Sequence, residues 1–137
     1  MANVAHNEVL FVEDSDLDFE TACVVLASHK WNLKVNRVSR AADLFTKLAA
    51  CKAALIIMDL KLPDGDGIDL VARLRQRAEL ANTPIVVFST SVNPGDETAA
   101  LAAGANEFCT KPVDVSRYLH VVNDFVVKWL SDRQELN

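Results

Sequence analysis

The sequence lacks the features of a disulfide-stapled or linker-rich protein. Its three cysteines, Cys23, Cys51 and Cys109, are odd in number and lie far apart inside apolar segments, which fits neither a disulfide framework nor a zinc site. Four glycines and four prolines leave little material for a flexible linker in a chain of 137 residues. These shortages favour one compact domain whose cysteines pack in a reducing compartment.

An excess of positive charge and long apolar runs are also missing. The formal net charge of −5 gives no long-range attraction to nucleic acid or to anionic membranes. No stretch reaches the roughly 18 apolar residues that span a bilayer, and residues 1–7 lack the basic and apolar parts of a signal peptide. We therefore expect a cytoplasmic protein without nucleic-acid or membrane partners.

What the sequence does contain is a strict alternation of apolar strands and amphipathic helices. The predicted strands are residues 8–12, 33–38, 54–58, 85–88 and 106–109. The predicted helices, with their capping residues, are 15–28, 39–50, 68–77, 94–103 and 115–130, and KLPDGDG is predicted as a loop. This alternation predicts an α/β fold with a parallel sheet and helices on both faces, in a single domain of residues 1–137 with its core in residues 8–130.

Acidic and polar side chains follow the predicted strands, at the point where each strand ends. Glu13 and Asp14 follow the first strand, and Asp59 follows the third. Ser89 and Lys111 follow the fourth and fifth strands. In an open parallel sheet, ligands bind beyond the carboxyl ends of the strands. We therefore expect these side chains to form one site.

The carboxylates of this set predict a magnesium site. Carboxylates that converge repel one another unless a cation is bound between them. Oxygen ligands favour Mg²⁺, with Mn²⁺ as an alternative, whereas zinc prefers histidine and cysteine. The expected metal ligands are Glu13, Asp14, Asp59 and the backbone carbonyl of Lys61.

Asp59 is the strongest candidate for a reactive group. It directly follows an apolar strand, where a helix cap or a solvated charge explains an acid poorly. A carboxylate beside bound Mg²⁺ is a competent nucleophile toward an activated phosphoryl group, with which it forms an acyl phosphate. Lys111 is suited to neutralise the phosphoryl oxygens, and Ser89 is suited to donate a hydrogen bond to them.

Four segments resemble the motif blocks of the response-regulator receiver family, in order and at the family's spacing. They are VLFVEDSDLD, LIIMDLKLPDGDGIDL, PIVVFSTS and GANEFCTKPVD, and they lie within residues 8–130. The resemblance implies a flavodoxin-like fold with strand order 2-1-3-4-5. It also implies that Asp59 is the phosphoacceptor, Lys111 the phosphate-binding lysine and Ser89 the switch hydroxyl.

The same resemblance assigns further roles. Glu13 and Asp14 become the acidic pair, in which Glu13 is a mild departure because the family often carries Asp there. Phe108 becomes the aromatic switch residue, at a position where many relatives have Tyr. It either rotates on activation or is simply a core residue of an edge strand. Pro112 is expected to follow a cis peptide bond.

A protein of this kind is a two-component response regulator. The resemblance implies that it accepts a phosphoryl group from a sensor histidine kinase or a phosphotransfer protein. It is then not an enzyme, and it catalyses only its own phosphotransfer and slow autodephosphorylation. The chain ends seven residues after Leu130, so we expect a stand-alone regulator without a DNA-binding output domain, which signals through its protein contacts.

A weaker resemblance suggests partners. The segments SDLDF, STSVNPGD and VVKWL resemble single-domain regulators that accompany phytochrome-type histidine kinases, a group in which dimerisation is common. The apolar arc of the last helix is wider than one sheet contact usually needs. It predicts a homodimer through Val121, Phe125, Trp129 and Leu130, unless the domain itself covers these side chains.

Three other functions are left open by the residues. Asp14-Ser15-Asp16 after an apolar strand resembles the nucleophile motif of haloacid-dehalogenase phosphohydrolases, although those enzymes usually need more length and a cap. A receiver fold that is never phosphorylated would be a binding module, against which the intact set of strand-end residues argues. An FMN-binding flavodoxin relative would need a phosphate loop rich in hydroxyl groups and glycine where this chain has carboxylates.

Overall fold

The computed structural model describes residues 7–135, with side chains described through Ser131. Its centre is a five-stranded parallel sheet with strand order β2-β1-β3-β6-β7. The strands are β1 (Glu8–Val12), β2 (Lys34–Val38), β3 (Leu55–Met58), β6 (Ile85–Ser89) and β7 (Glu107–Thr110). Counted along the chain, this is the predicted order 2-1-3-4-5, so the fold-class prediction is confirmed.

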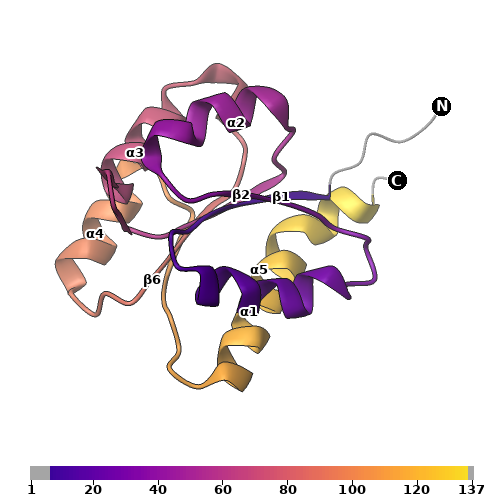
Figure 1. Cartoon of the computed structure of the whole chain (residues 1–137). Coiled ribbons are helices and arrows are strands. Elements are labelled where there is room, and N and C mark those ends of the chain that lie inside the picture. Colours follow the sequence, from indigo (N-terminus) through magenta and orange to yellow (C-terminus); the bar gives the residue numbers. More distant parts are fainter. Residues whose placement is uncertain (1–6, 136–137) are drawn as a thin grey trace.

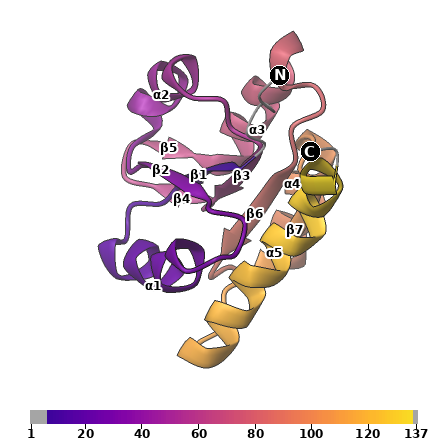
Figure 2. The same ribbon diagram turned by 90° about the vertical axis from the view of Figure 1, so that its right-hand side faces the viewer.

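Helices cover both faces of the sheet (Figure 1). One face carries α1 and α5, and the other carries α2, α3 and α4. The helices are α1 (Asp16–Ala27), α2 (Leu44–Ala50), α3 (Gly67–Arg75), α4 (Pro94–Ala103) and α5 (Val115–Glu135). Figure 2 shows the same layers after a 90° turn, with α5 as a long helix of 21 residues. No helix in the described part of the chain has the length and apolar character needed to cross a bilayer.

The alternation of side chains along the strands divides the core into two clusters. In β1, Leu10 and Val12 pack toward α2, α3 and α4, whereas Val9 and Phe11 pack toward α1 and α5. All four side chains are buried. Because both faces of the strand are covered, the sequence reads there as an uninterrupted apolar run.

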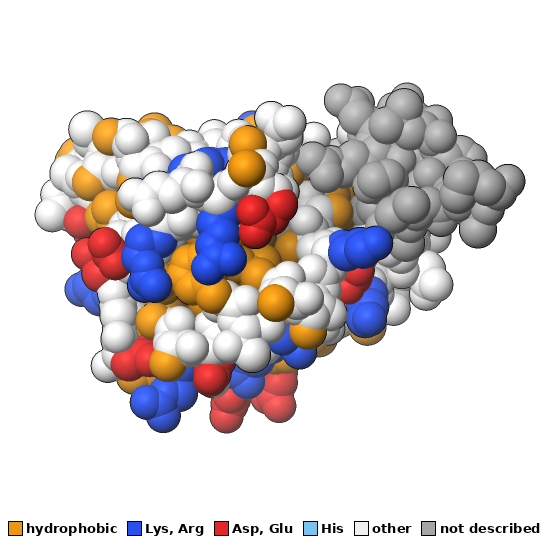
Figure 3. All heavy atoms as spheres, turned by 90° about the horizontal axis from the view of Figure 1, so that it is seen from above, with side chains coloured by type: hydrophobic (Ala, Val, Ile, Leu, Met, Phe, Trp, Pro, Cys, Tyr) orange, Lys and Arg blue, Asp and Glu red, His pale blue; other side chains and the backbone are white. Residues whose placement is uncertain are grey.

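Two arginine side chains stack on an aromatic ring of α2 at the surface beside α3. The guanidinium groups of Arg73 and Arg77 lie 4.9 and 4.5 Å from the centre of the Phe45 ring. Figure 3 looks onto this side and shows apolar surface between basic side chains. Cation–π contacts therefore join α2 to α3 and to the chain directly after α3.

The KLPDGDG segment, predicted as a loop, contains a small hairpin. β4 (Lys61–Leu62) pairs with β5 (Gly65–Asp66) in antiparallel register. Gly67 then begins α3, and its N–H donates to the carbonyl of Leu60 at 2.6 Å. A Cβ on Gly67 would lie 2.5 Å from the backbone oxygen of Asp59. Only glycine allows the chain to pass so close to Asp59.

The helix starts agree with the sequence at α1 but not at α2. Ser15 caps α1 as predicted. Ser39 does not cap α2, because a 3-10 turn, Ala41–Asp43, precedes that helix and the carboxylate of Asp64 accepts bonds from its first two N–H groups at 2.6 and 3.0 Å. These bonds hold the pKa of Asp64 below its usual range. The cap prediction is wrong because a distant residue supplies the acceptor.

α5 packs more of its apolar arc against the domain than the sequence suggests. Phe125 and Leu130 are buried in the cluster between α5, α1 and the sheet. The prediction that these two side chains belong to a dimer face is therefore wrong, since the helix contacts α1 as well as the sheet and buries a wider arc. Val121 and Trp129 are half-buried on the same cluster, and their part in a dimer stays a prediction.

Candidate functional site

The acids after the first and third strands meet at one edge of the sheet. β1 and β3 are neighbours, and Val12 lies opposite Met58 at their carboxyl ends. Ligand oxygens of Glu13, Asp14 and Asp59 consequently lie within 4.8 Å of one another. Glu13 is 1 % exposed, Asp59 is half-buried and Asp14 is exposed. The fold thus brings together the carboxylates that the sequence places at these strand ends.

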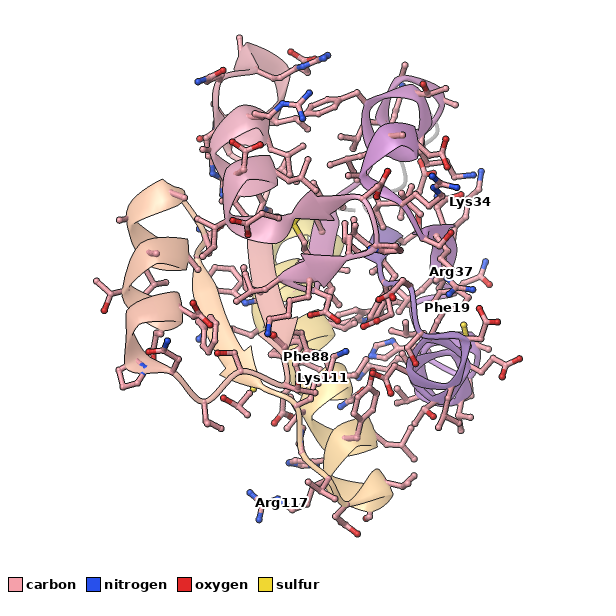
Figure 4. All side chains as sticks on the ribbon, turned by 60° about the vertical axis from the view of Figure 1, so that its left-hand side comes forward. Phe19, Lys34, Arg37, Phe88, Lys111 and Arg117 are labelled. Carbon is pink, nitrogen blue, oxygen red and sulfur yellow. The ribbon has the colours of Figure 1, made fainter. Side chains whose placement is uncertain are left out.

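Lys111 is the cation of this carboxylate cluster (Figure 4). Its Nζ donates to the carboxylates of Glu13 and Asp59 at 2.6 and 3.0 Å. A third bond, at 2.7 Å, joins it to Asp18. The Lys111 backbone N–H donates to the carbonyl of Ser89 at 2.7 Å, which ties the end of β7 to the end of β6. All three ammonium protons are therefore directed at carboxylates, in a side chain that is largely removed from solvent.

Burial and charge shift the proton affinities of this cluster. Burial raises the pKa of Glu13 to about 7; the hydrogen bond and charge of Lys111 oppose this shift, and the charge of Asp59 adds to it. Burial alone would lower the pKa of Lys111, but its contacts with the three carboxylates outweigh burial and raise it. Lys111 therefore stays protonated at neutral pH, whereas Glu13 is only partly ionised there.

The carboxylate cluster fits a hard divalent cation. Its ligand atoms are all carboxylate oxygens, and the exposure of Asp14 allows water to complete a coordination shell. Such ligands suit Mg²⁺ or Mn²⁺ rather than zinc. The N–H of Lys61 donates to Asp59 Oδ1 at 3.4 Å, so the Lys61 peptide lies beside the cluster. Metal binding by the Lys61 carbonyl stays a prediction.

Ser89 and Phe108 flank the site on the side of β6 and β7. Ser89 ends β6 and is buried, and its Oγ accepts a bond from the N–H of Ser91 at 3.3 Å. Thr90, the next residue, is exposed, as the alternation of side chains along a strand requires. Phe108 is half-buried against the cluster under α2, α3 and α4. Its ring packs inward in this structure, and its movement on activation stays a prediction.

The loop after β6 is connected to both α4 and β7. The Ser91 hydroxyl donates to Asp96 Oδ2 at 2.5 Å, and the Thr110 hydroxyl donates to the Ser91 carbonyl at 2.9 Å. Ala100 is the buried residue of α4. These bonds join the loop directly to a helix that few buried side chains hold in place.

Asp18 is a site residue that the sequence analysis missed. An acid three residues after Ser15 has an ordinary explanation at a helix start, and the Asp18 N–H does donate to Ser15 Oγ at 3.2 Å. Its carboxylate nevertheless turns to Lys111, which is 93 positions away in the chain. The hydroxyl of Tyr118 on α5 donates to the Asp18 carbonyl at 3.0 Å. Contacts over such separations leave no local signal in the sequence.

Arg37 of the edge strand β2 is a second residue that the sequence did not indicate. Its Nε donates to the carbonyl of Glu13 at 3.0 Å, and its Nη1 lies 2.8 Å from Asp16 Oδ1. The guanidinium lies over the Phe19 ring, 4.9 Å from its centre (Figure 4). Arg37 thereby fixes the backbone that carries the acidic pair.

The chain after Lys111 forms part of an apolar rim beside the carboxylate cluster. The described peptide bonds are all trans, so the prediction of a cis bond before Pro112 is wrong. Val113 and Val115 are strongly exposed, as is Leu17 on α1. These three side chains, which we call the apolar rim, border a pocket of about 140 Å³ between α1 and the start of α5.

The sequence matches the response regulator receiver domain family over residues 9–123. This match covers most of the chain, and the protein belongs to the response regulator receiver family. Receiver domains are the phosphoacceptor signalling domains of two-component systems. Membership excludes the haloacid-dehalogenase and flavodoxin families as alternatives.

Individual relatives resemble the chain in sequence and in structure. It is 32 % identical over 109 residues to the response regulator protein GraR of Staphylococcus saprophyticus, covering 80 % of this chain and 46 % of GraR. The chain thus spans less than half the length of that relative. Its structure resembles the phosphorylated cyanobacterial phytochrome response regulator RcpA, with a TM-score of 0.88, 28 % identity, and coverage of 93 % of this chain and 96 % of RcpA. It also resembles the Mn²⁺-bound response regulator Rcp1, with a TM-score of 0.84, 26 % identity, and coverage of 90 % of this chain and 94 % of Rcp1.

Proposed function

We propose that this protein accepts a phosphoryl group on Asp59 from the phosphohistidine of a sensor histidine kinase or a phosphotransfer protein. The observation that carries the proposal is the position of Asp59 Oδ2, 3.0 Å from the Lys111 ammonium and within the carboxylate cluster. The Asp59 side chain keeps 13 % of its surface exposed, so it is not sealed off from a donor. A buried acid with a purely structural ion pair would need no such access.

The reaction is a phosphoryl transfer from nitrogen to oxygen. A carboxylate oxygen of Asp59 attacks the phosphorus and a P–O bond forms, while the P–N bond breaks and leaves its electron pair on the donor imidazole. Lys111 binds a phosphoryl oxygen and balances part of its charge. Mg²⁺ supplies further charge neutralisation when it is bound. The residues that would hold it are Glu13, Asp14, Asp59 and, through its carbonyl, Lys61.

The signal leaves the site through Ser89 and the loop that follows it. We expect the Ser89 hydroxyl to turn to the phosphoryl group and to draw this loop inward. The bond from Thr110 to Ser91 carries the displacement to β7, where Phe108 packs. α4 follows because the displacement disturbs few buried contacts on that helix. Phosphorylation then changes the surface that α4 and β7 present to other proteins.

The apolar rim supports a docking place for the phosphodonor. The rim residues are exposed near Lys111, so an apolar surface of a donor protein can be buried against them: Leu17, Val113 and Val115. A phytochrome-type kinase is the proposed donor, supported by the likeness to RcpA, a phytochrome response regulator. We also propose a homodimer, with the half-buried Val121 and Trp129 of α5 in its contact.

Intact-mass measurement after incubation with Mg²⁺ and acetyl phosphate tests the acceptor. The parent protein is expected to gain the mass of one phosphoryl group, and Asp59→Asn is expected to gain none. Asp69→Asn, which removes an exposed acid of α3, is the matched control and should gain the adduct like the parent. An equal adduct on Asp59→Asn contradicts the assignment. A parent protein without any adduct favours a binding module that is never phosphorylated.

A further inference from the structure

Asp18 has no part in the predicted metal site, yet it makes one of the three bonds of the Lys111 ammonium. We propose that Asp18 is a positioning residue that holds the Lys111 ammonium in place for the phosphoryl group on Asp59. This inference rests on the proposed function of Asp59 as phosphoacceptor. It assigns a role in the transfer to a residue outside the strand-end motifs.

The three carboxylates around Lys111 differ in what phosphorylation does to them. Asp59 becomes an acyl phosphate, so its bond to Nζ passes to a phosphoryl oxygen. Glu13 belongs to the carboxylate cluster that fits the metal, so a bound cation would share the Glu13 oxygens with the ammonium. Asp18 lies outside that cluster, and phosphorylation of Asp59 does not alter its carboxylate, which accepts a bond of 2.7 Å from the ammonium. Asp18 is therefore the carboxylate that accepts a bond from Lys111 both before and after phosphorylation, and this bond orients the ammonium.

The position of Asp18 is itself fixed from two sides. The Ser15 hydroxyl accepts a bond from its N–H at 3.2 Å, and the Tyr118 hydroxyl donates to its carbonyl at 3.0 Å. Tyr118 is buried and packs its ring against Phe88 at 5.0 Å between centroids. Burial raises the pKa of the Tyr118 hydroxyl, so it remains a donor. The carboxylate thus stands on a backbone held by both α1 and α5.

A helix-start role alone would not require the contact between Asp18 and Lys111. An acid in the first turn already gains from the helix dipole when its side chain points to solvent. The Asp18 side chain instead turns inward, where it is 31 % exposed, to meet an ammonium that is 5 % exposed. A bond to a buried cation orients that cation, because the alternative positions of the ammonium lose an acceptor in surroundings poor in water.

The experiment compares Asp18→Asn and Asp18→Glu with Glu20→Gln, which removes an exposed charge two residues further along α1. The rate constant of adduct formation is measured over a range of acetyl phosphate concentrations with Mg²⁺ at saturation. In this reaction Asp59 attacks the phosphorus, a P–O bond forms, and acetate leaves with the electron pair of the bond that breaks. No proton or further reactant is required.

We expect Asp18→Asn to lower the limiting rate constant about tenfold, the loss that a slightly misplaced charged group causes. The acetyl phosphate concentration at half-maximal rate should change little, because removing Asp18 does not remove the cation that binds the donor. Asp18→Glu should recover most of the rate, and Glu20→Gln should react like the parent. Equal rates for Asp18→Asn and the parent overturn the inference, as do equal losses in Asp18→Asn and Glu20→Gln.

A second measurement does not depend on phosphorylation. Nitrogen-15 spectra of the metal-free protein should show a slowly exchanging Lys111 ammonium signal, assigned by its absence in Lys111→Arg. That signal should broaden or vanish in Asp18→Asn and return in Asp18→Glu. If the signal is unchanged in Asp18→Asn, the inference is overturned, even if the parent protein forms the phosphoryl adduct in the mass measurement. A parent that forms no adduct overturns the proposed function instead, while the spectra still report whether Asp18 holds the ammonium.

Discussion

The two faces of the sheet differ in how firmly they hold their helices. On the face of α1 and α5, the Phe88 ring packs against Tyr118 and Phe125, with ring centroids 5.0 and 5.1 Å apart. On the other face, α4 buries Ala100, and its Leu101 is 42 % exposed. The carboxylate cluster that contains Asp59 lies at the carboxyl ends of β1 and β3, between these two regions. The proposed phosphorylation switch needs one face that holds the charged groups in place and one helix that can shift, and the two faces of this sheet differ in that way.

The largest expected effect comes from truncating one apolar side chain on each face of the sheet. Phe88→Ala should destabilise the protein by about 3–5 kcal/mol, because it opens a cavity between the sheet and α5. Leu101→Ala should cost less than about 1 kcal/mol, since much of that side chain is already in water. Urea unfolding of both variants measures the two changes in the free energy of unfolding. Similar losses of unfolding free energy in the two variants would contradict the proposed difference between the two faces of the sheet.

Arg75 anchors the C-terminal end of α4 on the looser face of the sheet. Its Nε donates to the Gly104 carbonyl at 2.9 Å and its Nη2 to Asn106 Oδ1 at 2.6 Å, while Nη1 donates to two carbonyls of the α3–β6 connection. Arg75→Lys keeps the charge but not this set of bonds, and should cost about 2 kcal/mol by thermal or urea unfolding. Arg117→Lys, at an exposed position of α5, is the control and should change stability little.

Glu13 is a buried acid, and its titration makes the free energy of unfolding depend on pH. Glu13 has a pKa of about 7 in the folded protein, against 4.5 for the ordinary group. Between these values the folded state binds more protons than the unfolded state, so stability falls as pH rises from about 4.5 to about 7. The expected loss without metal is on the order of 1–2 kcal/mol. Urea unfolding at pH 5 and pH 7.5 measures it.

Glu13→Gln is the matched variant for this pH dependence. It keeps the shape of the side chain and removes its titration, so the slope between pH 5 and pH 7.5 should flatten. Glu20→Gln should keep the slope of the parent, because that carboxyl is exposed. A slope that survives in Glu13→Gln assigns the pH dependence to another group.

The smallest expected effect concerns the outer side of α5. Val121→Asp should weaken the proposed homodimer about tenfold, because it places a charge in an apolar contact. The stability of the monomer should change little by comparison, since Val121 is only half-buried. Sedimentation at high micromolar concentration, with and without acetyl phosphate, measures the self-association. A parent protein that remains monomeric in both conditions contradicts the dimer.

The sequence predicted the sheet and the carboxylate cluster because both depend on short-range patterns. Apolar runs such as Ala54 to Met58 mark buried strands, and an acid directly after the run, Asp59, has to appear at the strand end. The order of strands came from the family resemblance. Once β1 and β3 are neighbours, the position of Glu13 beside Asp59 follows from the register.

Features that depend on contacts between distant segments could not be predicted in the same way. Asp18 and Asp64 both look like acids at a local turn, yet one binds Lys111 and the other caps a helix of a different segment. Phe125 and Leu130 lie on a wide apolar arc, which a dimer and a second helix of the same domain explain equally well in sequence. Only the packing of α1 against α5 decides between them.

The register of Val12 opposite Met58 has a consequence for folding itself. The carboxylates that fit Mg²⁺ follow two different strands, β1 and β3, and they come together only when these strands pair. The unfolded chain therefore does not hold these carboxylates close enough to bind the ion. Free ion should therefore act as a folding ligand, adding about 2.7 kcal/mol at a hundred times its dissociation constant. The concentration of the ion would then set the fraction of folded molecules as well as the rate at which they react.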